Sequence, residues 1–103
     1  MEEKKVTLIE PVTVAGQEVR EVTLRRSTIG DEEDAMQQAI ALGRKGNPLT
    51  TEACLLSRVT GLPYDVLRSM HGPNYAAIRA AHNALFGHAP EEPAENPTTV
   101  KQG

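Results

Sequence analysis

Cysteine and aromatic residues are scarce in this sequence of 103 residues. Cys54 is its only cysteine, so no disulfide can form within the chain, and the composition is consistent with a reducing compartment. Tyr64, Tyr75 and Phe86 are its only aromatic residues, which is too few for a platform on which nucleic-acid bases stack. These shortages exclude a disulfide-stapled scaffold and disfavour a base-stacking surface.

Long apolar runs and a surplus of positive charge are also missing. No apolar run approaches the ~20 residues that a membrane-spanning helix needs, and no apolar segment of a secretory signal follows the charged start MEEKK. The 14 acidic and 11 basic side chains give a formal net charge of −3, whereas phosphate-binding surfaces need clustered Lys and Arg. We therefore expect a cytoplasmic protein that binds neither a membrane nor nucleic acid.

The residues that could carry chemistry do not form a recognisable site. Cys54 has no histidine partner in a sequence signature and is interpreted as a small buried apolar residue. His71, His82 and His88 are not spaced as metal ligands usually are. The acidic run at 31–34 lacks the alternating oxygen ligands and central glycine of a calcium loop. We predict no enzymatic activity, no cofactor and no metal site.

Residues 6–25 alternate apolar and polar side chains around a glycine, which predicts a β-hairpin. Pro11 cannot donate a ladder hydrogen bond and therefore suggests an edge or a break in the first strand. Ile9 and Val19 do not fit a register with a three-residue loop over 15–17, so a bulge or a different loop length is the alternative. That register pairs Val14 with Glu18, Val12 with Arg20 and Leu8 with Leu24.

Four short helices are predicted after the hairpin, and cap residues mark the first two. The first begins with a capping box formed by Thr28 and Asp31 and ends near residue 42. The second begins at Asn47 or Thr50 and ends at Gly61. The apolar face of the first helix contains Ile29, Met36 and Ile40, and that of the second contains Leu55, Leu56 and Val59.

A short third helix follows Pro63, and a longer fourth one ends at Gly87. Two faces are predicted on the fourth helix, one of larger residues and one of alanines that would let another helix approach closely. The first face contains Tyr75, Ile78, His82 and Leu85, and the second contains Ala76, Ala80 and Ala84.

Together these elements predict an α+β fold in which an N-terminal β-hairpin packs against about four short α-helices. Residues 1–87 are expected to form a single small domain. Residues 88–103, HAPEEPAENPTTVKQG, contain prolines and glutamates and almost no apolar side chains. Such a composition cannot build a packed core, so we predict a disordered C-terminal tail.

A pattern of single residues extends over residues 6–86. It consists of a strand with an internal proline, a turn glycine, a second strand ending in Leu-Arg, a Gly-Asp helix start and a helix ending in Thr-Gly-Leu-Pro. The matching residues are Leu8, Pro11, Gly16, Val22, Leu24, Arg25, Gly30, Asp31, Thr60, Gly61, Leu62, Pro63 and Tyr75. In this order and spacing the chain resembles the small tail assembly chaperones of Mu-like bacteriophages and prophages. It departs from them at Ser27, where a proline is expected, and at Asn74, where an acid is expected.

The resemblance implies a non-enzymatic protein of the bacterial host cytoplasm. Such a protein keeps the long, helical tape-measure protein soluble and helps to recruit tail-tube protein around it. The family often has a longer form made by translational frameshifting, and here the junction would lie in or after the tail. A homo-oligomer is an additional expectation, because a hairpin can leave a strand edge unpaired.

We expect the tape-measure protein to be bound as an amphipathic helix in a groove between the short helices. Because most apolar residues of a small protein form its core, only a minority of the candidate contacts must lie exposed. The candidates are Leu55, Leu56, Val59, Leu62, Val66, Leu67, Met70, Tyr75 and Phe86. A DNA-binding regulator with a helix-turn-helix over residues 53–70 and a structural adaptor retained in the phage particle are the alternatives.

Overall fold

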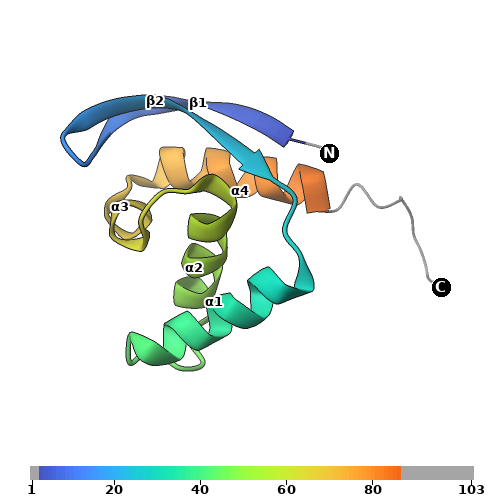
Figure 1. Cartoon of the computed structure of the whole chain (residues 1–103). Helices are drawn as coiled ribbons and strands as arrows, with labels where there is room; N and C mark the ends of the chain where they lie inside the picture. The colour runs from blue at the N-terminus through green and yellow to red at the C-terminus, as the bar shows by residue number, and fades with distance from the viewer. Residues whose placement is uncertain (1–2, 87–103) are drawn as a thin grey trace.

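Residues 3–86 fold into an N-terminal β-hairpin followed by four α-helices (Figure 1). The computed structural model describes residues 3–86, with Phe86 described for its backbone only. The predicted α+β fold is confirmed, whereas the predicted tail at 88–103 lies outside the described residues. The elements are β1 (Glu3–Val14), β2 (Gln17–Arg25), α1 (Ile29–Ala41), α2 (Pro48–Thr60), α3 (Tyr64–Ser69) and α4 (Gly72–Phe86).

The two strands pair antiparallel through a tighter turn than the sequence predicts. The turn consists of Ala15 and Gly16, with φ values of 51° and 80°. Two positive φ angles are what a two-residue hairpin turn with the twist of the strands requires. The register predicted from a three-residue loop is therefore wrong. The observed pairs include Val14 with Gln17, Val12 with Val19 and Lys4 with Leu24.

The first strand bulges between Thr7 and Val12. Residues 8–11 of β1 stand opposite Arg20 alone, so their backbone groups cannot all bond to β2. Pro11, which has no N–H to donate, lies inside this bulge. The predicted register thus differs from the observed one for two reasons, a shorter turn and a bulge in β1.

Asn74, near the start of α4, supplies the hydrogen bonds that the bulge cannot obtain from β2. Its Oδ1 accepts the backbone N–H groups of Ile9 at 2.8 Å and Glu10 at 3.1 Å, and its Nδ2 donates to the Glu10 carbonyl at 2.8 Å. The side chain is 2% exposed. An ionised acid at this position could accept the two N–H groups but could not donate to the carbonyl. The amide therefore fits the bulge better than the acid expected from the resemblance.

Local side-chain chemistry sets the helix ends as predicted. Thr28 Oγ1 accepts the backbone N–H of Asp31, and the Asp31 carboxylate accepts the N–H of Thr28, which completes the capping box of α1. Asn47, rather than Thr50, caps α2 through its side-chain oxygen. Gly61 ends α2 with a φ of 80°, a conformation that glycine adopts without a Cβ penalty.

The core lies between the hairpin and the helices α2, α3 and α4. In Figure 1 the hairpin runs along α4, and α1 lies on the far side of α2 from the hairpin. The inner face of the hairpin contributes alternate aliphatic residues, and the helices contribute their apolar stripes. The core residues are Val6, Leu8, Val22, Leu24, Leu56, Val59, Leu62, Leu67, Ile78, Ala81 and Leu85.

The two predicted faces of α4 have different outcomes. Ile78, His82 and Leu85 are buried, which confirms the face of larger residues. The alanine stripe is exposed, and within residues 3–86 no helix approaches it. The close approach that this stripe would allow is therefore not used within the described part of the chain, because the hairpin and α2 pack on other sides of α4.

Replacing Asn74 with Asp tests the bulge. We expect Asn74→Asp to lower the free energy of unfolding at pH 7 by about 2–3 kcal/mol, because a buried carboxylate would face the Glu10 carbonyl without a donor. Urea unfolding followed by circular dichroism measures the change. Asn83→Asp on the exposed side of α4 is the matched control and should stay within about 0.5 kcal/mol. Equal losses in both variants would contradict the role of Asn74.

Candidate functional site

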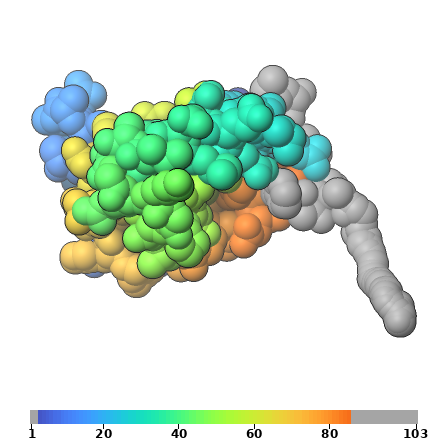
Figure 2. Space-filling view, turned by 90° about the horizontal axis from the view of Figure 1, so that it is seen from below, coloured from blue at the N-terminus to red at the C-terminus, as the bar shows by residue number. Residues whose placement is uncertain are grey.

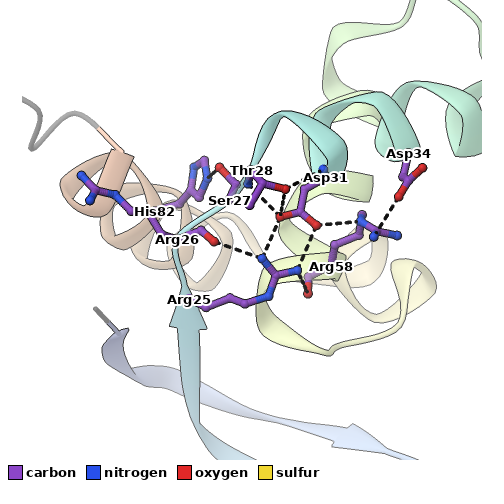
Figure 3. A network of polar contacts seen from close by, with 8 residues as sticks. All are labelled: Arg25, Arg26, Ser27, Thr28, Asp31, Asp34, Arg58 and His82. Atoms are coloured by element: carbon purple, nitrogen blue, oxygen red, sulfur yellow. Dashed lines mark hydrogen bonds and ion pairs between the residues drawn. The ribbon is translucent and has the colours of Figure 1, made fainter. Parts of the chain in front are cut away.

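A buried carboxylate joins three elements at one end of the molecule. Asp31, in the first turn of α1, is 4% exposed. Arg25 at the end of β2 donates to both of its oxygens, at 2.7 and 2.9 Å. Arg58 of α2 donates through Nε to Oδ1 at 3.1 Å, and Thr28 donates its backbone N–H to Oδ2 at 2.8 Å (Figure 3). The carboxylate thus fixes the start of α1 against β2 and α2.

We call the contacts of Asp31 with Arg25, Arg58 and Thr28 the Asp31 joint. Its arginines are matched by acidic side chains of α1. The Arg25 guanidinium, with further help from Thr28 and Arg58, holds the pKa of Asp31 well below its usual range, although burial opposes the shift. The carboxylate is therefore ionised at neutral pH. Arg58 also reaches Asp34 at 3.0 Å, so the acidic start of α1 is partly neutralised by α2. Arg25, at the end of β2, is therefore paired with an acid rather than left to solvent.

Helix α1 packs on α2 through small residues and turns its large apolar side chains outward. Ala35 and Ala39 are buried, whereas Met36 is 58% and Ile40 46% exposed. The predicted apolar face of α1 therefore exists, but it is not part of the core. Contiguous exposed apolar side chains of this kind mark a binding surface more often than single ones do.

This outward face forms one wall of an apolar groove over α2. The groove has a volume of about 660 Å³ and lies between α1 and α4. Figure 2 shows α1, α2 and α4 together on this face of the molecule. We call the site the apolar groove. Its lining residues are Glu32, Ala35, Met36, Ile40, Lys45, Gly46, Pro48, Thr51, Glu52, Leu55, His82 and Asn83.

The opposite wall of the apolar groove is held by polar contacts between α2 and α4. Glu52 accepts hydrogen bonds from the Tyr75 hydroxyl at 2.8 Å and from Arg79 at 2.8 and 3.1 Å. Burial, reinforced by Glu52, raises the pKa of Tyr75, so the hydroxyl keeps its proton. Burial lowers the pKa of His82, whose Nε2 lies 3.1 Å from the Ser27 hydroxyl. The imidazole is therefore neutral at pH 7 and adds no charge to the groove.

The predicted contact residues are divided between the core and the surface. Leu55 is half-buried and lines the apolar groove. Half-buried positions outside the groove are occupied by Val66, Met70 and Tyr75. The side chain of Phe86 lies outside the described residues. Four further candidates belong to the core, namely Leu56, Val59, Leu62 and Leu67.

Two residues of the groove, Met36 and Ile40, are absent from the predicted contacts. The spacing of Met36 and Ile40 predicts one shared helix face but does not indicate whether that face meets the core. The available signal is the parallel pair Ala35 and Ala39 at the same spacing, which offers α2 a smoother surface than Met and Ile do.

Cys54, the metal-ligand candidates and the possibility of a membrane span were also considered from the sequence. Cys54 is fully buried, and burial raises the pKa of its thiol, which disfavours the reactive thiolate. Residues 3–86 contain no group of three or more His, Cys, Asp and Glu side chains that could hold a metal ion. None of the described helices is both long enough and apolar enough to span a membrane.

Residues 53–70, considered above as a helix-turn-helix, present few side chains that could contact DNA bases. Its second helix, α3, has six residues. Arg58, on α2, the first helix of this segment, forms ion pairs with Asp31 and Asp34. A major-groove reader instead presents several donor side chains along one exposed helix face.

Replacing Asp31 with Asn tests the joint. At pH 7 we expect Asp31→Asn to lower the free energy of unfolding by about 2–3 kcal/mol, because two arginines lose their counter-charge. Asp34→Asn, at an exposed partner of the same Arg58, should cost less than about 1 kcal/mol. Urea unfolding at several pH values measures both.

The joint also predicts a pH dependence. The unfolded chain takes up a proton on Asp31 near its ordinary pKa of 3.8, whereas the folded chain holds that proton off to lower pH. Wild-type stability should therefore fall as the pH drops below about 4, and the difference from Asp31→Asn should shrink. A difference that stays constant down to roughly pH 2 would contradict this assignment.

Comparison with known proteins agrees with the resemblance seen in the sequence. Residues 5–87 match the family model described as phage tail assembly chaperone proteins, E, or 41 or 14. No curated protein and no solved structure matches the chain. The family match spans nearly all of β1, the whole of β2 and the four described helices, and it includes Asp31 with its partners and the apolar groove. The protein therefore belongs to the phage tail assembly chaperone family.

Proposed function

We propose that this protein binds apolar helical segments of a phage tape-measure protein and thereby keeps them soluble while the tail-tube protein assembles around them. It acts by reversible binding, without catalysing a reaction, in the cytoplasm of the bacterial host. Family membership supports the role in tail assembly. The apolar groove, with its exposed Met36 and Ile40, supports the proposal that the bound segment, or client, is an apolar helix.

The apolar groove suits an amphipathic helix. A helix that lays its apolar face into such a groove presents residues spaced by three and four positions, and Met36 and Ile40 have the same spacing on α1. Complete burial of a fully exposed large apolar side chain contributes about 1.5–3 kcal/mol, and Met36 and Ile40, 58% and 46% exposed, could supply part of that each. Methionine adds adaptability, because its unbranched side chain fits clients of different shape. Of the contacts predicted from sequence, Leu55 is the one that we assign to this groove.

Oppositely charged residues at the two ends of the apolar groove would set the orientation of a bound helix. Glu32, in the first turn of α1, lies at one end, and Lys45, after the last turn of α1, lies at the other. A client helix with basic residues near Glu32 and acidic residues near Lys45 would match both. Such rim charges contribute more to orientation and association rate than to affinity.

Removing the two exposed apolar anchors tests the proposal. The protein is co-expressed with the tape-measure protein of the same phage or prophage, and the complex is isolated through a tag on the tape-measure protein. We expect the double variant Met36→Ser and Ile40→Ser to reduce the bound chaperone by about tenfold or more, because two anchors are lost. Its thermal unfolding midpoint should remain near that of the wild type, since both side chains are exposed.

Ile9→Ser is the matched control, because Ile9 is 67% exposed but lies on the hairpin, away from the apolar groove. Equal binding by all three proteins would contradict the proposed groove. Absence of any complex with the wild-type protein would overturn the proposed client. Salt-dependent binding to duplex DNA instead would favour the regulator, and recovery of the protein in finished particles would favour the adaptor.

A further inference from the structure

A second depression lies on a different face of α2 from the apolar groove. It has a volume of about 410 Å³ and is bounded by α2, α3, the start of α4 and the loop between α1 and α2. We call it the arginine hollow. The residues that define its chemistry are Arg44, Leu49, Tyr64, Arg68, Tyr75 and Arg79.

Two of the three arginines that line the arginine hollow, Arg44 and Arg68, have no acidic partner among the described residues. Arg79 is neutralised by Glu52 and lies over the Tyr75 ring, 5.1 Å from its centroid. Among the described residues, Arg44 and Arg68 have no ion pair or side-chain hydrogen bond, and no Asp or Glu lines the hollow. This concentration of arginines is unexpected in a chain with a net charge of −3.

Arg44 is held in place by its backbone. Its N–H donates to the Ala39 carbonyl at 2.9 Å, and its own carbonyl accepts the N–H of Asn47 at 3.1 Å. Gly43 and Gly46 flank it with φ values of 77° and 79°, a conformation that glycine adopts readily. A cation presented from a fixed loop loses less conformational freedom on binding than one on a mobile segment.

The composition of the hollow identifies the class of its ligand. Arginine binds planar carboxylates through two parallel hydrogen bonds. Arginine, tyrosine and methionine are also the residues enriched in protein–protein interfaces, and Met70 completes this set here. Leu49, 65% exposed, places an apolar contact beside the charges. A nucleic-acid backbone would instead need a longer track of cations.

We propose that the arginine hollow binds the carboxylate side chains of an acidic segment of a protein partner. Arg44 and Arg68 form the ion pairs, and Leu49 contacts an apolar residue next to the acids. This proposal does not rest on binding of the tape-measure protein at the apolar groove, because the two sites use different faces of α2.

The test uses a synthetic peptide in which leucines alternate with pairs of glutamates, titrated into ¹⁵N-labelled full-length protein and followed by NMR. We expect shifts of the backbone amides of Arg44, Leu49 and Arg68, and weaker binding as salt is added. The double variant Arg44→Glu and Arg68→Glu should lose about tenfold or more in affinity. Arg20→Glu, an exposed arginine on the hairpin, is the control of equal charge type and should change affinity less than about twofold.

Several results would overturn the proposal. One is equal binding of a peptide with glutamine in place of every glutamate, and another is an equal loss in Arg20→Glu. Preferential binding of a single-stranded oligonucleotide at the same amides would assign the hollow to nucleic acid. Shifts of these amides with protein concentration alone would assign it to a second copy. None of these results would bear on the Met36 and Ile40 variants, so the two proposals fail separately.

Discussion

The buried carboxylate of Asp31 determines where α1 lies. An ionised group is tolerated out of water only where opposite charges and hydrogen-bond donors surround it. Arg25 and Arg58 supply these from two other elements, and the capping box adds donors from the same turn. A displaced α1 would lose both guanidinium partners at once. Because its first turn is fixed, the alanines of α1 meet α2 and its larger apolar side chains border the groove.

The helix caps, which depend on neighbouring residues, were predictable, whereas the pairing of the two strands was not. The caps at Thr28, Asn47 and Gly61 each depend on residues within a few positions, and all three were predicted, Asn47 as one of two alternatives. The predicted strand register is wrong because the turn is one residue shorter than expected and because a bulge interrupts β1. That bulge is completed by Asn74, which lies 64 residues from Glu10 in the chain. No alternation within the strands could reveal such a partner.

The candidate site was harder to predict than the fold, for a related reason. Hydrophobic periodicity finds an apolar face but does not say whether protein or solvent covers it. On α2 the face with Leu56 and Val59 meets the core. The strongest apolar pattern in the sequence therefore identified core residues rather than a binding surface. On α1 the buried face is made of alanines, and the bulkier Met36 and Ile40 remain outside. The contact of Asp31 with Arg58, which comes from another helix, helps to hold α1 in the observed orientation.

The alanine contact of α1 also has an evolutionary consequence. Since Met36 and Ile40 contribute nothing to the core cluster, substitutions there can alter the shape and chemistry of the groove without disturbing the packing of the hairpin on α2 and α4. The positions that hold the scaffold and the positions that we propose to contact a partner are therefore separate sets of residues. With such a division, the proposed binding surface can change in sequence while the packing beneath it is retained.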